Sequence, residues 1–385
     1  MRIFLSSQQS LRPHAVPGYT FWEFYFKQGI TEAGHEVLET PRVDWAEGLT
    51  PLNPEARACW LGETWTRTIE FIRAEHARKP IDLFLSYLFP DQVEPVAVAD
   101  IQALGIPCVN FFCDNVREFT RVPHNFRGFD LHWVPEADAR SLYRAAGFPF
   151  IYAPMPMWVP PELRVVPKKE NRDITFIGSR DILREDLLGE AVARGLLLRL
   201  YGDGWLPGDP AAKPSPRAFG KTLANQLAFL RTHGLQGFAK RGTYQLHRLR
   251  PKDWIAQSWQ PLVEREKYFR ATRESQVVLG INRYPSFHHS FSKPGRYSRL
   301  RDVEAPMLGT CYLTEKAPGL EDLYDLGTEI EIYSNTNELL EKVAQLQRDP
   351  KRRANLRRLG QRRALAEHTI ARSLSRIFGQ LGLAA

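Results

Sequence analysis

The sequence has no apolar stretch close to the roughly 20 residues that a membrane-spanning helix needs. Its beginning, Met1 to Ser10, holds one apolar run, which is too short for the core of a secretory signal peptide. These absences predict a cytoplasmic protein. Peripheral binding at the inner face of the membrane is compatible with them.

Cysteine is scarce, and its spacing argues against two further classes of protein. The four cysteines show no paired spacing with each other or with histidines, unlike a zinc site or a disulfide framework. We therefore expect reduced, mostly buried thiols and no bound metal. Zinc-finger spacing, RNP-like aromatic motifs and basic heptads are also missing, so the sequence does not favour nucleic acid as a partner.

The net charge of +8 is concentrated in two stretches. Residues 209–258 carry nine Lys or Arg against two acids, and residues 342–376 carry eleven against two. Charged runs of this kind are usually solvated helix faces. Stretch 209–258 also mixes its cations with aromatic residues, which suits binding to an anionic acceptor or to an anionic membrane surface.

Short apolar and β-branched runs alternate with helix-like segments, which is the pattern of parallel strands joined by crossover helices. The pattern predicts an α/β fold with two parallel sheets. The expected strands are 2–6, 81–87, 106–112, 131–134 and 150–153 in the first half, and 173–178, 196–201, 276–281, 310–314 and 329–333 in the second.

A proline-rich segment after Pro154 excludes both helix and central strand, and it marks the domain boundary. The predicted domains are residues 1–155 and 173–350, with 156–172 as the linker. Residues 351–385 are predicted as a terminal helix with its arginines in water. Residues 209–258 interrupt the second domain and predict an insertion of two or three basic, partly apolar helices.

Ligands of open parallel sheets bind at the carboxyl ends of the strands, so the loops that follow strands are candidate sites. Gly178 and Ser179 end one expected strand, and Arg184 lies one turn into the next helix. Backbone N–H groups and a cation in such a place form a phosphate cradle. A glycine at a strand-to-helix turn also has a purely structural explanation.

The loop after the strand that ends near Asn282 is denser in hydrogen-bond donors, and it contains Lys293 and Arg296. A leaving diphosphate needs cations and oriented N–H groups, so this loop predicts phosphate binding, against the alternative of an exposed polar loop. His288 and His289 have no carboxylate at ligand spacing, so we expect hydrogen bonds to phosphate or sugar from them rather than metal binding.

Arg301 and Glu304 follow in a helix expected over 299–308. An arginine and a carboxylate three residues apart share a helix face, so an intrahelical ion pair is the simplest interpretation. The alternative assigns Arg301 to a diphosphate and Glu304 to the ribose hydroxyls of a nucleotide.

These segments resemble the C-terminal domain of the glycosyltransferases group 1 superfamily, and within it the spore-maturation-type (CgeB-like) branch. The resemblance covers most of the C-terminal half and, more loosely, residues 112–155. Two departures are the turn 305–309, which reads Ala-Pro-Met-Leu-Gly in place of Ala-Cys-Gly, and the long basic insertion. The matching positions are Asn282, Arg301, Glu304, Ala305, Gly309, Thr314, Gly327 and Glu329, with Phe176–Ser179, Tyr201–Trp205 and His368–Thr369.

The resemblance implies a GT-B fold, in which two Rossmann-like domains with parallel sheets face a central cleft and the terminal helix packs back on the first domain. It implies a glycosyltransferase that moves a hexose or related sugar from a nucleotide diphosphate sugar to a glycan, lipid-linked or protein acceptor, in bacterial cell-envelope or surface-glycan synthesis. UDP, GDP and dTDP are not distinguished, and no further cofactor is expected. No Asp-x-Asp pair occurs, so cations would replace a divalent metal.

On the acceptor side, the candidate groups are His14 and Tyr19, after the first expected strand, and Asp114 and Asn115, after the strand 106–112. His14 and Asp114 are the candidate catalytic residues. An inverting enzyme needs such a base within reach of the acceptor hydroxyl, and a retaining enzyme does not, so the stereochemistry stays open. Two rival functions are a nucleotide-sugar epimerase of the same fold, which has no need of the basic insertion, and a non-catalytic nucleotide- or glycan-binding protein.

Overall fold

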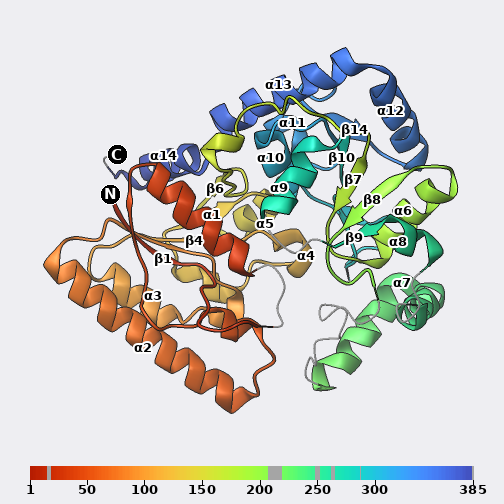
Figure 1. The fold of residues 1–385 in the computed structure, drawn as a ribbon. Helices are drawn as coiled ribbons and strands as arrows, with labels where there is room; N and C mark the ends of the chain where they lie inside the picture. Colours follow the sequence, from red (N-terminus) through yellow and green to blue (C-terminus); the bar gives the residue numbers. More distant parts are fainter. Residues whose placement is uncertain (15–18, 207–218, 248–251, 262–264, 287, 384–385) are drawn as a thin grey trace. The chain divides into compact units, whose positions relative to one another are not determined.

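The computed structural model describes residues 1–14, 19–206, 219–247, 252–261, 265–286 and 288–383, which divide into two compact units (Figure 1). Unit 1 holds Met1–Trp158 and His368–Ala385, and unit 2 holds Val159–Pro214 and Phe219–Glu367. Each unit contains one six-stranded parallel sheet with helices, so the predicted α/β class is confirmed.

The sheet of unit 1 has the strand order β2-β1-β3-β4-β5-β6. Its four central strands are buried along their whole length, which explains why the sequence shows them as short continuous apolar runs. The strands are β1 (Arg2–Ser6), β2 (Glu36–Leu38), β3 (Leu83–Ser86), β4 (Cys108–Phe111), β5 (Leu131–Val134) and β6 (Phe150–Tyr152).

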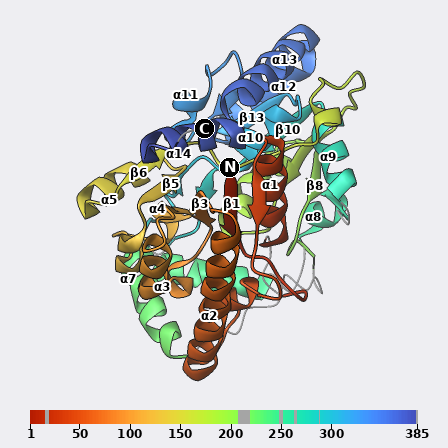
Figure 2. The ribbon, with the colours of Figure 1, turned by 90° about the vertical axis from the view of Figure 1, so that its left-hand side faces the viewer.

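Helices pack on this sheet, and α2 and α3 lie side by side (Figure 2). On α1, Gly29 allows a close approach of α14, because a Cβ at this position would lie 2.3 Å from the Ile370 side chain. The helices of unit 1 are α1 (Tyr19–Glu32), α2 (Pro54–Arg78), α3 (Pro95–Gln102), α4 (Asn115–Glu118), α5 (Ala139–Ala146) and α14 (Ile370–Leu381).

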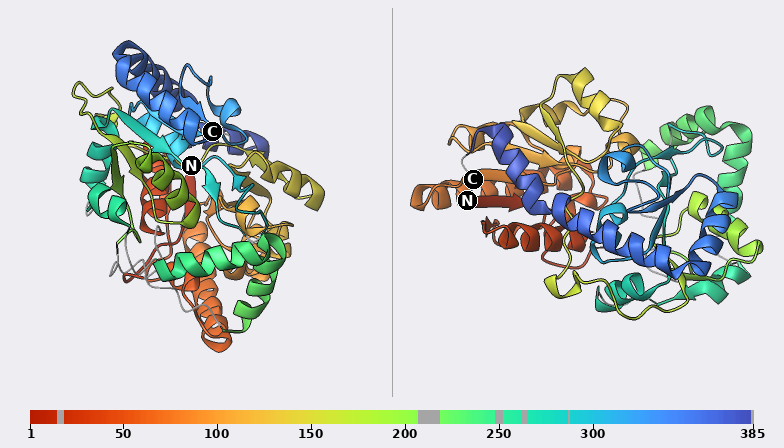
Figure 3. Two further views of the ribbon diagram at one scale, coloured as in Figure 1. Left: turned by 90° about the vertical axis from the view of Figure 1, so that its right-hand side faces the viewer. Right: turned by 90° about the horizontal axis from the view of Figure 1, so that it is seen from above.

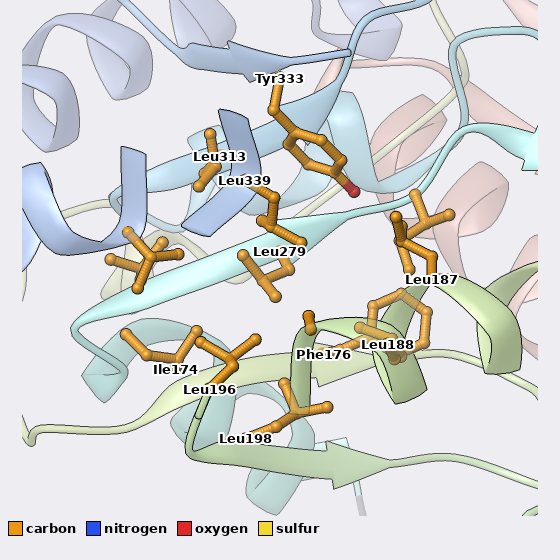
Figure 4. Close-up of a cluster of buried hydrophobic side chains, with 14 of the residues drawn as sticks. Ile174, Phe176, Leu187, Leu188, Leu196, Leu198, Leu279, Leu313, Tyr333 and Leu339 are labelled. Atoms are coloured by element: carbon orange, nitrogen blue, oxygen red, sulfur yellow. The ribbon is translucent and has the colours of Figure 1, made fainter. Parts of the chain in front are cut away.

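The sheet of unit 2 has the order β14-β13-β10-β7-β8-β9. Figure 4 shows its core, in which Phe176, Leu279 and Leu313 from the strands pack with Leu187 of α6 and Leu339 of α12. The strands are β7 (Ile174–Ile177), β8 (Leu198–Tyr201), β9 (Trp259–Gln260), β10 (Val277–Gly280), β13 (Tyr312–Glu315) and β14 (Glu331–Tyr333).

The helices of unit 2 include α12 and α13, which contact each other and are blue in Figure 3. A small antiparallel hairpin, β11 (Arg283–Tyr284) and β12 (Gly295–Arg296), stands apart from the large sheet. The helices are α6 (Ile182–Ala193), α7 (Phe219–His247), α8 (Asp253–Ser258), α9 (Arg265–Glu274), α10 (Arg301–Met307), α11 (Leu320–Leu323), α12 (Thr336–Arg348) and α13 (Pro350–Glu367).

The prediction of one terminal helix with its arginines in water is wrong on two counts. The helix is interrupted at Thr369, whose side chain caps α14 by accepting the backbone N–H of Arg372, as a β-branched hydroxyl residue readily does. Arg353 and Arg357 are buried, because both pair with Glu170.

The described part of the expected insertion contains α7 and α8, while residues 209–218 and 248–251 lie outside the described residues. The two halves of α7 meet at Gly234, whose φ of 66° and ψ of −177° are not helical, and they run in different directions (Figure 3). Among the described residues, no helix is both long enough and apolar enough to cross a membrane.

Candidate active site

The strand order of unit 2 reverses between β7 and β10, because the chain runs outward to β8 on one side and to β13 on the other. At such a switch point, the loops after the two strands diverge and leave a crevice at the carboxyl ends. The two loops are those that the sequence singled out, after Ile177 and after Gly280. Burial lowers the pKa of Arg283, but the hydrogen bond and charge of Glu315 raise it overall, and the Asp181 carboxylate after the first loop adds to the rise.

The first of these loops brings Gly178, Ser179 and Arg184 together. One Nη of Arg184 donates to the Ser179 carbonyl oxygen at 2.7 Å and to its hydroxyl at 3.2 Å. The Gly178 N–H donates to the Tyr201 carbonyl at 2.9 Å, and the start of α6 is capped by Asp181. Part of the expected phosphate cradle is thus occupied by contacts within the protein, and phosphate binding at these residues stays a prediction.

Gly202, the first residue after β8, is required by the close approach of the loop after β7. Gly202 has a φ of 123°, and a Cβ there would lie 2.3 Å from the Gly178 carbonyl oxygen. The same oxygen accepts the indole N–H of the fully buried Trp205 at 2.7 Å. Glycine at 202 therefore lets the ends of β7 and β8 close against each other.

The second loop is organised around Glu315, the last residue of β13, whose side chain is fully buried. One carboxylate oxygen accepts the Nε of Arg283 at 2.8 Å and the Nε of Arg296 at 2.7 Å. The other accepts the backbone N–H groups of Asn282 and Arg283. Burial raises the pKa of Glu315, but the hydrogen bonds and charges of the two arginines outweigh burial and lower it overall.

Arg283 and Arg296 also face each other across the β11–β12 hairpin. Like charges directly opposite in a ladder repel, so the Glu315 carboxylate is what allows the two cations to lie together. Asn282 is fixed to the same strand, because its amide donates to the Glu315 carbonyl at 2.8 Å and to the Thr314 hydroxyl at 3.2 Å. Lys293 lies in the loop between the hairpin strands and is exposed.

Arg301 and Glu304 meet in the predicted intrahelical pair, at 3.5 Å, in α10. A third residue joins them: the Tyr268 hydroxyl hydrogen-bonds both the Glu304 carboxylate and the Arg301 guanidinium, which also stacks 4.9 Å from the Tyr268 ring. The Glu304 side chain is fully buried. The role of Glu304 at ribose hydroxyls stays a prediction.

Asp302 connects this helix to the Glu315 cluster. Its carboxylate accepts the hydroxyls of Tyr312 at 2.9 Å and Thr314 at 2.8 Å, and Thr314 in turn accepts the Asn282 amide. Burial raises the pKa of Asp302, although several hydrogen bonds act in the opposite direction. Asn282, Arg296 and α10 therefore belong to one continuous polar network.

In unit 1 the strand order reverses between β1 and β3, and the loop after β1 carries His14. The His14 Nε2 lies 2.9 and 2.8 Å from the two carboxylate oxygens of Asp44, and both side chains are buried. A carboxylate on one ring nitrogen is how imidazole bases are oriented. Tyr19 is the first residue of α1, and its side chain lies outside the described residues.

Asp114, the other acceptor-side candidate, lies three residues beyond the end of β4 and directly before α4. Its side chain is about a quarter exposed and lies 3.9 Å from Arg117. The backbone that follows it is held by Glu136, a buried carboxylate that follows β5. Among the described residues, no group of three His, Cys, Asp or Glu side chains could hold a metal ion.

Sequence reasoning missed Glu315, Arg283, Tyr268, Asp44 and Glu136. Glu315 directly follows the expected strand 310–314 and Arg283 lies two residues after the expected strand 276–281, so the rule applied to their neighbours would have found them. Tyr268 contacts Glu304 in unit 2 and Asp44 contacts His14 in unit 1, and the strand pattern connects neither residue with its partner. Their roles depend on tertiary contacts, which leave no local signal in the sequence.

Comparisons with known proteins match both halves of the chain. A family model described as "Glycosyl transferase-like" matches residues 184–379. Sucrose-phosphate synthase from Thermosynechococcus elongatus has a TM-score of 0.59 and 15% identity, over 99% of this chain and 98% of that chain. No curated protein sequence matches the chain.

Two further solved structures are similar. Anabaena HepE in complex with UDP-glucose has a TM-score of 0.55 and 15% identity, over 99% of both chains. A glycosyltransferase from Rickettsia africae has a TM-score of 0.57 and 9% identity, over 100% of this chain and 99% of that chain. Because these similarities span both parallel sheets, the predicted GT-B fold is confirmed.

Proposed function

The chain belongs to the glycosyl transferase-like family, and from that premise we propose that it transfers a hexose or related sugar from a nucleotide diphosphate sugar to an acceptor. The acceptor is a glycan, a lipid-linked sugar or a protein, in bacterial cell-envelope or surface-glycan synthesis. We place the chain in the spore-maturation-type branch, on the motifs from Asn282 to Glu329.

The observation that carries the proposal is the arginine cluster at the switch point of unit 2. Arg283 and Arg296 are gathered there by one carboxylate, Glu315, so the cluster keeps a net positive charge. Lys293 adds a further cation on the same loop. Oriented cations of this kind stabilise the charge that develops on a leaving diphosphate. We propose that they do so without a divalent metal.

The donor nucleotide would lie along the carboxyl ends of β7 and β10, against Gly178, Ser179, Arg184 and Asn282, with Arg301 and Glu304 beyond. Glu304 is assigned to the ribose hydroxyls. The Tyr268 hydroxyl must then release the Glu304 carboxylate or share it with the ribose. HepE, of similar fold, forms a complex with UDP-glucose, so UDP-glucose is the first donor to test.

On the acceptor side, the protein needs a base only if it inverts the anomeric centre. His14, oriented by Asp44, and Asp114, held at the start of α4, are the two candidates. Replacing each residue separately distinguishes them. Only the replacement of the base should lower kcat while the affinity for the donor stays unchanged.

We also propose a peripheral location at the inner membrane face, through α7. Exposed apolar side chains lie on this helix beside the exposed cation Arg231: Leu227 is 51% exposed, Leu235 80% and Phe238 42%. Apolar and basic residues on one helix suit the interface of an anionic bilayer.

The test of the proposed function is incubation of the full chain with UDP-, GDP- and dTDP-sugars, with and without candidate acceptors. Transfer that depends on an acceptor supports the proposal. Interconversion of the donor without an acceptor identifies an epimerase. Nucleotide binding with neither reaction for any donor identifies a non-catalytic binding protein and overturns the proposal.

A further inference from the structure

The insertion helix α7 contacts the loop that joins β11 to β12 (the 285–294 loop), of which the structure describes residues 285–286 and 288–294. This loop carries Lys293, and the strands at its two ends have two residues each. The hydrogen bonds within its described residues are short-range, such as the Lys293 N–H to the Ser290 carbonyl at 3.0 Å. Contacts from outside the loop are therefore needed to select one conformation.

His233 of α7 provides the central contact. Its Nε2 lies 2.7 Å from the Ser286 carbonyl oxygen, so the imidazole donates a hydrogen bond to the start of the loop. Its ring centroid lies 4.1 Å from that of Phe229 on α7 and 4.3 Å from that of Phe291 in the loop. Burial lowers the pKa of His233, which favours the neutral form of the stacked ring.

Phe291 completes the stack from the side of the loop. Its ring centroid also lies 5.5 Å from that of Phe229, and the Lys240 amine lies 6.0 Å from its centroid. Lys240 forms an ion pair with Asp186 of α6, which attaches the second half of α7 to the body of unit 2. Both halves of α7, on either side of Gly234, therefore contribute to holding one phenylalanine of the loop.

We propose that the insertion serves to position the 285–294 loop, with His233 as the positioning residue that fixes Ser286 and Phe291. The inference that a nucleotide diphosphate binds at Lys293 rests on the proposed function. The inference that α7 orders the loop does not. An insertion that the sheet itself does not require thereby acts on donor binding.

Two substitutions separate the two contacts of His233. His233→Phe keeps the ring stack and removes the donor to Ser286, and His233→Gln keeps a donor and removes the stack. Phe291→Leu breaks the stack from the loop, and Gln236→Ala, at an exposed position on the same helix, is the matched control. Amide hydrogen exchange of the full chain reports the loop, with the β10 amides as an internal measure of global stability.

We expect exchange of the 288–293 amides to rise by about fivefold in His233→Gln and Phe291→Leu, because each loses the ring contact. His233→Phe should raise it by a similar factor, because it loses the hydrogen bond to Ser286. The β10 amides and Gln236→Ala should remain at the level of the parent. Binding of UDP, measured by calorimetry, should weaken by a similar factor, and kcat at saturating donor should change less than KM.

Unchanged loop exchange in both stack variants overturns the inference. So does an increase that β10 shares in proportion, because that outcome reports a general loss of stability. If the parent binds none of UDP, GDP and dTDP, the proposed function fails while the exchange data still decide whether α7 orders the loop.

Discussion

The carboxylate of Glu136 accepts the backbone N–H of Asn115 at 3.1 Å, from a fully buried position at the end of β5. Its second oxygen accepts the N–H of Val116 at 3.0 Å, and Tyr143 donates its hydroxyl to the Asn115 side chain at 2.9 Å. The residue immediately before this turn is Asp114. The backbone next to this candidate base is therefore held in place by a buried acid from the loop after the neighbouring strand, β5.

This relationship predicts a pH-dependent stability. Burial, followed by the charge of Asp114, raises the pKa of Glu136 to about 8, whereas an unfolded glutamate ionises near ~4.3. Between these values the folded state binds more protons, so the free energy of unfolding falls as pH rises, by at most about 1.4 kcal/mol per pH unit. Urea unfolding at pH 5, 6.5 and 8 should show this fall, and Glu136→Gln should flatten it.

The exposed Glu55 of α2 provides the control for this experiment, because Glu55→Gln should leave the slope of the parent intact. Parallel loss of stability in the parent and in Glu136→Gln would show that the slope comes from another group.

Replacement of Glu315 should destabilise unit 2. Glu315→Gln leaves Arg283 and Arg296 facing each other without their shared carboxylate, and removing one partner from a buried ion pair costs about 3 to 5 kcal/mol. Because Arg296 is about a third exposed, we expect the lower end of that range. Glu341→Gln on α12, an exposed position, should change the midpoint of urea unfolding little. Equal midpoints for the two variants would contradict this reading.

Glu304→Ala should weaken nucleotide binding by about 1 to 3 kcal/mol if its carboxylate binds the ribose. Tyr268→Phe is the second variant to compare with the parent. It removes the hydroxyl that holds Glu304 and keeps the ring that packs on Arg301. Calorimetry on folded variants measures both. If Glu304→Ala binds the nucleotide as tightly as the parent does, the Arg301–Glu304 ion pair has a structural role only.

The parts of the fold that were predictable are those with local signals. The continuous apolar runs gave strands such as 2–6 and 131–134 with their observed bounds, because central parallel strands are buried on both faces. The cap at Asn335 was readable from Glu338 three residues later. β9 and the β11–β12 hairpin were missed, because two-residue strands carry no periodicity.

The predicted site was partly accessible for the same reason. The switch-point rule led to Asn282 and Arg296, because they follow a strand. The burial of Glu304 and its contact with Tyr268 could not be foreseen, since Tyr268 lies on a helix far away in sequence. The buried arginines Arg353 and Arg357 looked like solvent-facing residues because their partner, Glu170, comes from the linker.

Transfer activity should survive EDTA, because the proposed diphosphate site supplies its own cations, Arg283, Arg296 and Lys293. The measurement compares initial rates of sugar transfer in EDTA, in magnesium and in manganese. A rate that collapses in EDTA and returns with either ion would show that the arginine cluster does not replace a metal.

The last prediction concerns α7 and anionic membranes. The full chain should float with vesicles that contain anionic lipid at low salt, and should stay behind with neutral vesicles or at high salt. Each cation near an anionic surface contributes about 1 kcal/mol, so Arg231→Gln should lower the bound fraction several-fold. Leu235→Gln with Phe238→Gln should lower it further, because burying an apolar side chain is worth about 1.5 to 3 kcal/mol. Gln236→Ala, between the two on the same helix, is the control. If the variants float as the parent does, α7 does not bind the membrane and its exposed face is an ordinary solvated surface. The positioning of the 285–294 loop is then the role that is left to test for α7.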